Sequence, residues 1–291
     1  MFLKFDLCDL VKILNALLYI YVQNFRTSEN DCSMLSKNKI KFINSIKKKK
    51  YRDIQQCFFV EGEKLVDELL HSDVQTISIF AVVEWLEKKR SVLSNLNDIE
   101  IVEVKEEDLK KISALTTPNK VLAIAKQPSY SFTFEEIKEC LNIFLDNIKD
   151  PGNFGTIIRI ADWYGIKNVF CSNESVDVFN PKVVQSTMGA IFRTKIHYVD
   201  SSNFLDKLQQ LDDFNIYGTF LEGDNIYKTE LSKNGMIIMG SESQGISDNL
   251  KPFINNKLFI PNYPLDVKTS ESLNISIATA ITCSEFRRRI I

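Results

Sequence analysis

Three short polar segments in the second half of the chain combine residue types that can position a reacting group. Asp150–Ala161 follows an apolar run, and within it Asn153 opens a helix-like repeat and Arg159 lies six residues further on. Gly240–Ser247 follows another apolar run and carries a glutamate between its glycines, and Ser272–Ser276 opens the last helix-like repeat. Amides, a carboxylate and a guanidinium can orient a hydroxyl, grip a phosphate and stabilise developing negative charge.

Each segment alone also fits a purely structural role. Asn153 and Ser272 stand where helix-capping residues are common, and Arg159 could extend its aliphatic stem over an apolar surface. Glu242 could be a capping carboxylate. The glycines around it would let a ligand approach the backbone, and a helix expected after Gly245 would offer free N–H groups.

The elements that must position these segments are strands that alternate with helices. Apolar runs predict strands before each segment, over 141–146, 236–240 and 257–260, and helical spacing predicts helices over 153–164 and 273–289. The other elements expected in this half are strands over 168–171, 195–199 and 215–220 and helices over 180–192 and 203–211. Such alternation predicts an α/β fold with a mostly parallel sheet, whose carboxyl edge is the usual ligand crevice.

A second, smaller α/β domain is expected before it. Strands are predicted over 57–60, 76–82, 99–104 and 121–125, and helices over 63–71, 84–95 and 106–113. Residues 127–134 have the composition of a linker. We therefore divide the chain into a leader (1–33), a first domain (34–126), this linker and a second domain (135–291).

The leader is rich in apolar residues, but its longest uncharged run, 13–25, is shorter than the roughly 20 residues that span a membrane. It also lacks a signal-peptide cleavage pattern. An extra amphipathic helix, a membrane-surface segment, a disordered leader and an upstream leader ahead of a later start at Met34 all fit. We expect no stable membrane anchor.

Composition excludes several classes of function. A net charge of −2 argues against a uniformly basic nucleic-acid binder, so an RNA surface must be local. Six cysteines are scattered singly, which favours a reduced, cytoplasmic protein over a disulfide or zinc framework. With only two histidines, no metal site is expected. The Walker and G-x-G-x-x-G patterns are missing, which leaves nucleotide hydrolysis and dinucleotide binding without their usual motifs.

A local basic segment does exist, because residues 36–52 hold many lysines and no acidic residue. A short helix is expected to run into a lysine-rich turn there. A solvated charged face is one interpretation. The other is an RNA-binding surface in which positive side chains contact phosphates, and the candidates are Lys47, Lys48, Lys49, Lys50 and Arg52.

Taken together, the three polar segments resemble a known family. In order, and with x for any residue, they read Asp150-Pro151-x-Asn153-x-Gly155-x-x-x-Arg159-x-Ala161, then Gly240-x-Glu242-x-x-Gly245-x-Ser247, then Ile260-Pro261 followed by Ser272-Leu273-Asn274-Ile275-Ser276. They look like the three motifs of the SpoU/TrmH family, RNA ribose 2′-O-methyltransferases of the SPOUT class. Lys37–Arg52 followed by Phe59-Val60-Glu61-Gly62 is similar to that family's substrate-binding domain, so the resemblance spans residues 34–289.

The resemblance implies a second domain with a deep trefoil knot, S-adenosyl-L-methionine bound in that knot, and a homodimer that shares its active sites. It implies RNA as substrate, ribosomal more than transfer RNA, without specifying the nucleotide. By carry-over, the donor pocket is formed by Thr219, Leu221, Gly240, Ile260 and Leu273. The reacting end is formed by Asn153, Arg159, Glu242, Ser272 and Asn274.

The chemistry suits these residue types, because a sulfonium methyl group is already electrophilic and the protein has only to align a ribose hydroxyl and accept its proton. In the family the arginine matching Arg159 is proposed as the base. A guanidinium stays protonated, so gripping the neighbouring phosphate is an alternative role. Asn153 could orient the hydroxyl or the arginine, and Glu242 could hold Asn153 or Arg159.

One departure from the family pattern leaves alternatives open. Residues 262–271 contain no glycine, where the family has a shorter, glycine-containing loop that wraps the donor. Donor affinity could therefore be altered. A non-catalytic RNA- or ribosome-binding protein that keeps the fold is the rival hypothesis, and methyl transfer to a base is a third.

Overall fold

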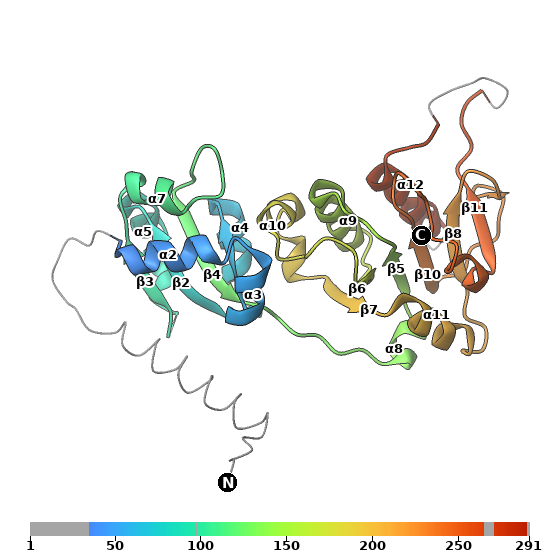
Figure 1. Ribbon diagram of the computed structural model, residues 1–291, viewed down its shortest axis with the longest axis horizontal. Helices are drawn as coiled ribbons and strands as arrows, with labels where there is room; N and C mark the ends of the chain where they lie inside the picture. Colours follow the sequence, from blue (N-terminus) through green and yellow to red (C-terminus); the bar gives the residue numbers. More distant parts are fainter. Residues whose placement is uncertain (1–34, 97, 265–270, 290–291) are drawn as a thin grey trace, which may run out of the picture. The chain divides into compact units, whose positions relative to one another are not determined.

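The computed structural model describes residues 35–96, 98–264 and 271–289 (Figure 1). The leader 1–33 and most of the unusual loop, 265–270, lie outside the described residues, and so do the predictions made for them. The trefoil knot that the resemblance implies stays a prediction. Among the described residues, no helix combines the length and the apolar character needed to cross a membrane.

The first domain is built on a four-stranded sheet in the order β1-β4-β2-β3. β4 is antiparallel to β1 and to β2, whereas β2 and β3 are parallel. The strands are β1 (Cys57–Glu61), β2 (Thr76–Ala81), β3 (Glu100–Glu103) and β4 (Val121–Lys126). The helices are α2 (Lys37–Ser45), α3 (Lys49–Gln55), α4 (Glu63–Leu70), α5 (Val83–Lys88), α6 (Arg90–Leu93) and α7 (Glu106–Ile112).

Two predictions for this domain were wrong in detail. The lysine-rich segment is only partly a turn: residues 46–48 turn after α2 as predicted, but Lys49 and Lys50 begin α3, which ends where Gln56 adopts a left-handed conformation with φ of 50°. The single helix expected over 84–95 is two short helices, because Lys89 leaves helical geometry between α5 and α6.

The second domain contains a seven-stranded sheet in the order β7-β6-β5-β10-β8-β11-β9, and every neighbouring pair is parallel. This confirms the predicted parallel sheet. The strands are β5 (Leu141–Leu145), β6 (Asn168–Ser172), β7 (Lys195–Val199), β8 (Ile216–Phe220), β9 (Asp224–Asn225), β10 (Gly235–Met239) and β11 (Asn256–Phe259). The α-helices are α8 (Phe134–Lys138), α9 (Pro151–Trp163), α10 (Pro181–Thr187), α11 (Ser201–Gln209) and α12 (Ile275–Arg288), and the 3₁₀ turns are η1 (Ala190–Phe192) and η2 (Lys251–Phe253).

Central strands and close helix packing hold the second domain together. All residues of β5 and β10 are buried, which explains why both were continuous apolar runs. α9 packs against α10 and α12. The contact with α10 requires Gly155, because a Cβ there would lie 2.5 Å from the Cβ of Ser186. α10 is shorter than predicted, since Met188 and Gly189 both take positive φ values and end it.

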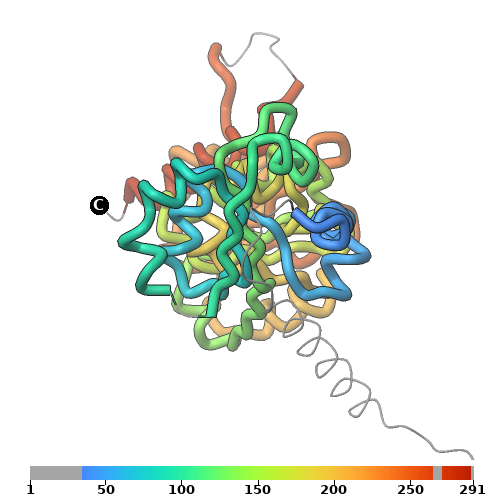
Figure 2. Tube along the Cα trace, turned by 90° about the vertical axis from the view of Figure 1, so that its left-hand side faces the viewer, coloured from blue at the N-terminus to red at the C-terminus, as the bar shows by residue number. Residues whose placement is uncertain are grey.

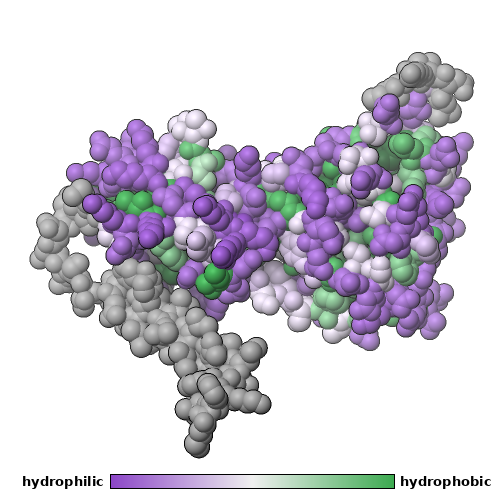
Figure 3. Space-filling view, in the orientation of Figure 1, coloured by the Kyte–Doolittle hydropathy of each residue, from purple (hydrophilic) through white to green (hydrophobic). Residues whose placement is uncertain are grey.

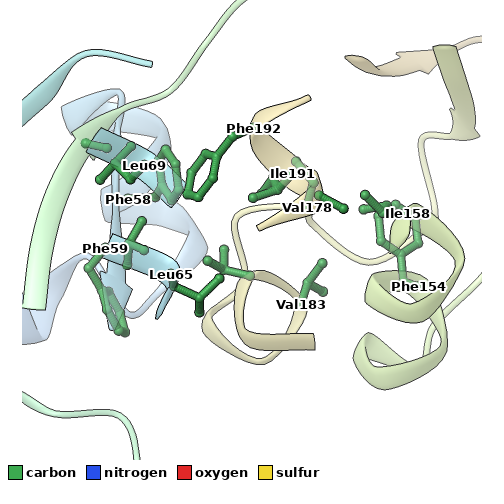
Figure 4. Close-up of a cluster of buried hydrophobic side chains, with 14 of the residues drawn as sticks. Phe58, Phe59, Leu65, Leu69, Phe154, Ile158, Val178, Val183, Ile191 and Phe192 are labelled. Atoms are coloured by element: carbon green, nitrogen blue, oxygen red, sulfur yellow. The ribbon is translucent and has the colours of Figure 1, made fainter. Parts of the chain in front are cut away.

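Apolar side chains of the two domains form one continuous cluster (Figure 4). Phe58 of β1 and Leu69 of α4 face Ile191 and Phe192 of η1, and Ile158 of α9 lies beyond them in the same close-up. Phe58 also packs against Phe179, with ring centroids 4.7 Å apart. Figure 2 follows the same trace from the side of the four-stranded sheet.

Arg52 anchors this junction and corrects one prediction. Its side chain is only 2% exposed, and its Nη2 lies 2.5 Å from Oδ2 of Asp177 in the second domain. Its Nη1 donates to the carbonyls of Ile46 and Lys47 at 3.0 and 2.6 Å. A guanidinium committed to these partners does not face an RNA phosphate, so Arg52 organises the basic segment from inside.

His197 of β7 is a buried histidine in an aromatic environment. It is 5% exposed, its ring stacks on Phe170 at 4.9 Å between centroids, and its Nε2 lies 3.3 Å from Oδ1 of Asn168. Burial, assisted by the nearby charge of Lys195, lowers the pKa of His197 from 6.5 to about 4. The folded protein therefore holds this imidazole neutral.

The depressed pKa of His197 predicts a loss of stability in mild acid. Because the unfolded chain binds the proton more tightly, the contribution is complete above pH 6.5 and is lost as pH falls towards about 4. The free energy of unfolding lost in this way amounts to about 2 kcal/mol at about pH 5. Urea unfolding of wild type and His197→Phe at about pH 7 and about pH 5 should show a smaller pH effect in the variant. Replacing the exposed His71 with Asn should leave the pH effect unchanged, and equal pH effects in wild type and His197→Phe would refute the assignment.

Candidate active site

The structure brings the three polar segments together in one hydrogen-bonded cluster. Nδ2 of Asn153 and Nδ2 of Asn274 both donate to Oε1 of Glu242, each at 2.8 Å. Nδ2 of Asn274 also lies 3.0 Å from Oδ1 of Asn153, which closes a triangle. These residues are 89, 32 and 121 positions apart in the sequence. We call this set the polar triangle.

The first corner is held by the start of α9. Asp150, not Asn153, is the capping residue: its Oδ1 accepts the N–H of Asn153 at 2.7 Å, and Pro151 occupies the first turn. The suggestion that Asn153 caps the helix was therefore wrong. Because Asp150 satisfies the backbone, the amide of Asn153 is free to turn towards Glu242.

The last corner is held by the start of α12. Oδ1 of Asn274 caps the helix by accepting from the N–H groups of Ser276 and Ile277 at 2.9 and 3.4 Å. This fixes the amide so that its nitrogen points to Glu242 and Asn153. One amide thus serves both the helix and the triangle.

Ser276 completes the triangle and was not among the predicted site residues. It is 4% exposed, and its Oγ donates to Oδ1 of Asn153 at 3.0 Å. The sequence signal that could have identified Ser276 is its position two residues after the helix-capping Asn274. Ser272, which was predicted, is exposed and stands outside the hydrogen bonds of the triangle.

Glu242, the middle corner of the polar triangle, stands on a tight turn between Gly240 and Gly245. Ser241 and Gly245 exchange two backbone hydrogen bonds of 3.0 and 2.8 Å, and Gly245 has a φ of 66°. A Cβ on Gly240 would lie 2.1 Å from the carbonyl carbon of Gly245, so only glycine fits there. No helix begins directly after Gly245: Ile246 lies in a bend, residues 248–250 form a turn that leads into η2, and the N–H of Ser247 donates to Asp146 at 2.7 Å.

The predicted donor-binding residues stand at one edge of the sheet. β10, β8 and β11 are neighbours and parallel, so their carboxyl ends bring Thr219, Gly240 and Ile260 to the same edge. Leu221 is 67% exposed and Leu273 is 45% exposed. Exposed leucines and the main-chain groups at these strand ends suit a ligand that binds through apolar and main-chain contacts.

Arg159 lies outside the triangle. It is exposed on α9, about 9 Å along the helix axis from Asn153 and about 120° around it. Within the described ranges its guanidinium has no hydrogen-bond partner, and Glu242 therefore holds Asn153 and not Arg159. Thr156 and Trp163 share its face of α9, and Trp163 is 84% exposed.

The lysines of the basic segment differ in availability. Lys48, Lys49 and Lys50 are exposed, although Nζ of Lys49 contacts Asp53 at 2.8 Å. Nζ of Lys47 donates to the carbonyl of Ser113 at 2.7 Å, and burial lowers the pKa of Lys47 against an opposing effect of Glu61. The surface around α2 and α3 is largely hydrophilic (Figure 3).

The part of the chain that the structure describes holds no group of three or more histidine, cysteine, aspartate or glutamate side chains arranged to bind a metal ion.

Comparisons with known proteins match both domains. Residues 140–284 match the SpoU rRNA Methylase family, and residues 37–123 match the MRM3-like substrate binding domain. Over 253 residues, 86% of this chain and 96% of the relative, the sequence is 28% identical to the 23S rRNA (guanosine(2553)-2′-O)-methyltransferase RlmP of Bacillus subtilis.

Two solved structures are similar to this chain over most of its length. A TrmH-family structure from Porphyromonas gingivalis has a TM-score of 0.79 and 39% identity, covering 88% of this chain and all of its own. An AdoMet-bound rRNA methyltransferase from Sinorhizobium meliloti has a TM-score of 0.77 and 28% identity, covering 89% of this chain and 97% of its own.

Proposed function

Because this chain belongs to the SpoU rRNA methylase family, we propose that it transfers a methyl group from S-adenosylmethionine to a ribose 2′-hydroxyl of ribosomal RNA. The predicted RNA methyltransferase activity and methyl donor agree with the family assignment. The polar triangle carries the proposal: three chain-distant segments place two amides and a carboxylate beside the strand ends that would hold the donor.

The donor site is assigned to Thr219, Leu221, Gly240, Ile260 and Leu273. The residues fit this group, since the neighbouring ends of β10, β8 and β11 present main-chain groups at one edge of the sheet and the exposed leucines can cover an adenine ring. When bound, the donor supplies an electrophilic methyl group. The task left to the protein is to exclude water and hold the hydroxyl in line.

The polar triangle is assigned the task of orienting the ribose. Both side-chain atoms of Asn153 are committed, its nitrogen to Glu242 and its oxygen to Asn274 and Ser276. Oε1 of Glu242 accepts both amide nitrogens, so its Oε2 is the atom left to accept a bond from a ribose hydroxyl. A fixed carboxylate is a preorganised acceptor, and Ser272 could assist from the exposed entrance of α12.

Arg159 is assigned the phosphate beside the target ribose, and a homodimer explains its position. Arg159 shares the exposed face of α9 with Trp163, while Ile277 is 53% exposed on the neighbouring α12. A second copy covering this face would bury these apolar side chains and bring Arg159 of one chain to the polar triangle of the other. Two parallel N–H donors would then grip the phosphate.

Ribosomal RNA is the proposed substrate because RlmP, by its name, acts on 23S rRNA. The match to RlmP covers 96% of that protein and 86% of this chain, so it includes both domains. Lys48, Lys49 and Lys50 are assigned to phosphate contacts, with Lys47 in a lesser role because it is already bonded. We also propose a cytoplasmic location, which suits the scattered single cysteines.

The function is tested by methylating ribosomal RNA with purified protein and mapping the product by alkaline hydrolysis, because a 2′-O-methyl ribose blocks cleavage at that position. RNA treated with wild-type protein should contain a position that resists alkaline hydrolysis. Arg159→Ala should slow transfer by about 10²- to 10³-fold while the fold and donor binding are kept. Lys167→Ala, which removes another exposed charge, should transfer normally.

The same assay separates the alternatives. Donor and RNA binding without any transfer would support the non-catalytic rival, and a methylated base without protection would support base transfer. Mixing Arg159→Ala with Glu242→Ala should restore part of the activity if the two residues act across a dimer. Normal turnover by Arg159→Ala alone would overturn its assignment.

A second prediction concerns the basic segment. Changing Lys48, Lys49 and Lys50 together to Gln should weaken RNA binding and reduce the slope of log affinity against log salt by about two, because fewer counterions are released. Donor affinity should not change. The matched control changes three exposed lysines of the same domain, Lys105, Lys110 and Lys120, and should retain both affinity and slope. A triple variant that binds RNA with an unaltered salt slope would rule out this surface.

A further inference from the structure

A pocket of about 310 Å³ lies outside the polar triangle, beneath the segment that joins the two sheets. Its lining includes Gln127 and Tyr130 of that segment, Thr194, which directly precedes the sheet's edge strand β7, and Tyr198 of β7. Gln56, the residue that ends α3, completes the rim. The volume is at the lower end of the range for small-ligand sites.

The walls are aromatic and fixed in place. The hydroxyl of Tyr198 donates to the carbonyl of Val176 at 2.6 Å and accepts the N–H of Val178 at 2.8 Å. Phe179 is held against Phe58 of the first domain. Rings already held this way lose little freedom when a flat guest stacks on them.

The two amide side chains of the pocket keep their oxygens as acceptors. Nε2 of Gln56 donates to the carbonyl of Asp53 at 2.6 Å, and Nε2 of Gln127 donates to that of Cys57 at 3.3 Å. Each amide oxygen is left to accept.

The charge of the pocket suits a neutral guest. His197 lines it as a neutral imidazole, because its pKa is lowered to about 4. A phosphate would find no cation there. The lysines lie instead at the start of α3, with Lys50 about 9 Å along the helix axis from Gln56. One short helix therefore carries phosphate-binding side chains at its start and the pocket rim at its end.

We propose that this pocket receives one unpaired RNA base that carries an exocyclic amino group, while the lysines of α3 hold the adjoining backbone. Aromatic stacking with hydrogen bonds to a base edge is the usual way a protein reads single-stranded RNA. The two amide oxygens of Gln56 and Gln127 match amino donors and disfavour uracil, whose exocyclic groups are both carbonyls. This inference rests on the proposed function only in taking RNA as the ligand.

The test measures binding of the full chain to fluorescent octanucleotides of cytidine and of uridine, which differ only in base groups. Wild type should bind the cytidine strand about tenfold more tightly, within the range of a good base contact. Ser129→Trp, which fills the pocket from an exposed lining position, should remove the preference. Ser131→Trp, an exposed neighbour outside the lining, should keep it.

Several outcomes overturn the proposal. Equal binding of the two strands by wild type would do so, as would a preference that survives in Ser129→Trp. Free cytidine bound as tightly as the octanucleotide would assign the pocket to a small nucleoside instead. A protein that does not transfer methyl groups could still prefer the cytidine strand. The binding assay therefore tests the pocket, and the methylation assay tests the proposed reaction, independently of each other.

Discussion

The proposed active site depends on one interaction, the convergence of two amides on a single carboxylate oxygen of Glu242. Asn153 opens α9, Asn274 caps α12, and Glu242 stands on a turn that only Gly240 permits. Each corner satisfies its own backbone first and then contributes a side chain. Distant parts of the chain are thus joined through hydrogen bonds of 2.8 to 3.0 Å. The hydroxyl of Ser276 adds one more hydrogen bond to Asn153.

The rest of the molecule supports this cluster from two directions. The parallel sheet brings three strand ends to one edge beside the triangle, and Gly155 lets α9 lie close to α10. On the other side, the buried pair between Arg52 and Asp177 ties the basic segment to the second domain. Breaking such a pair by removing one partner costs about 3–5 kcal/mol, because a charge is left buried. The proposed RNA-binding lysines and the reacting end therefore share one framework.

Much of this was readable from the sequence, for physical reasons. Apolar runs in β5 and β10 had to be buried strands, and the ordered polar motifs located the corners of the triangle. The predictions that failed concerned side chains whose roles depend on contacts between distant parts of the chain. The basic pattern could not distinguish the interior Arg52 from the exposed Lys48, and a capping pattern could not tell that Asp150 would replace Asn153. Ser276 resembled an ordinary first-turn serine, and Arg159 was placed with the triangle although helix rotation carries it to another face.

The central claim, that the polar triangle acts as one unit, is tested most directly by a double-mutant cycle on single-turnover methyl transfer with Asn153→Ala and Glu242→Ala. If the two side chains work only together, the double variant should transfer methyl groups about as slowly as the slower single variant. Rate losses that simply multiply would show that the two residues act independently, and the contact between them would then have no part in catalysis.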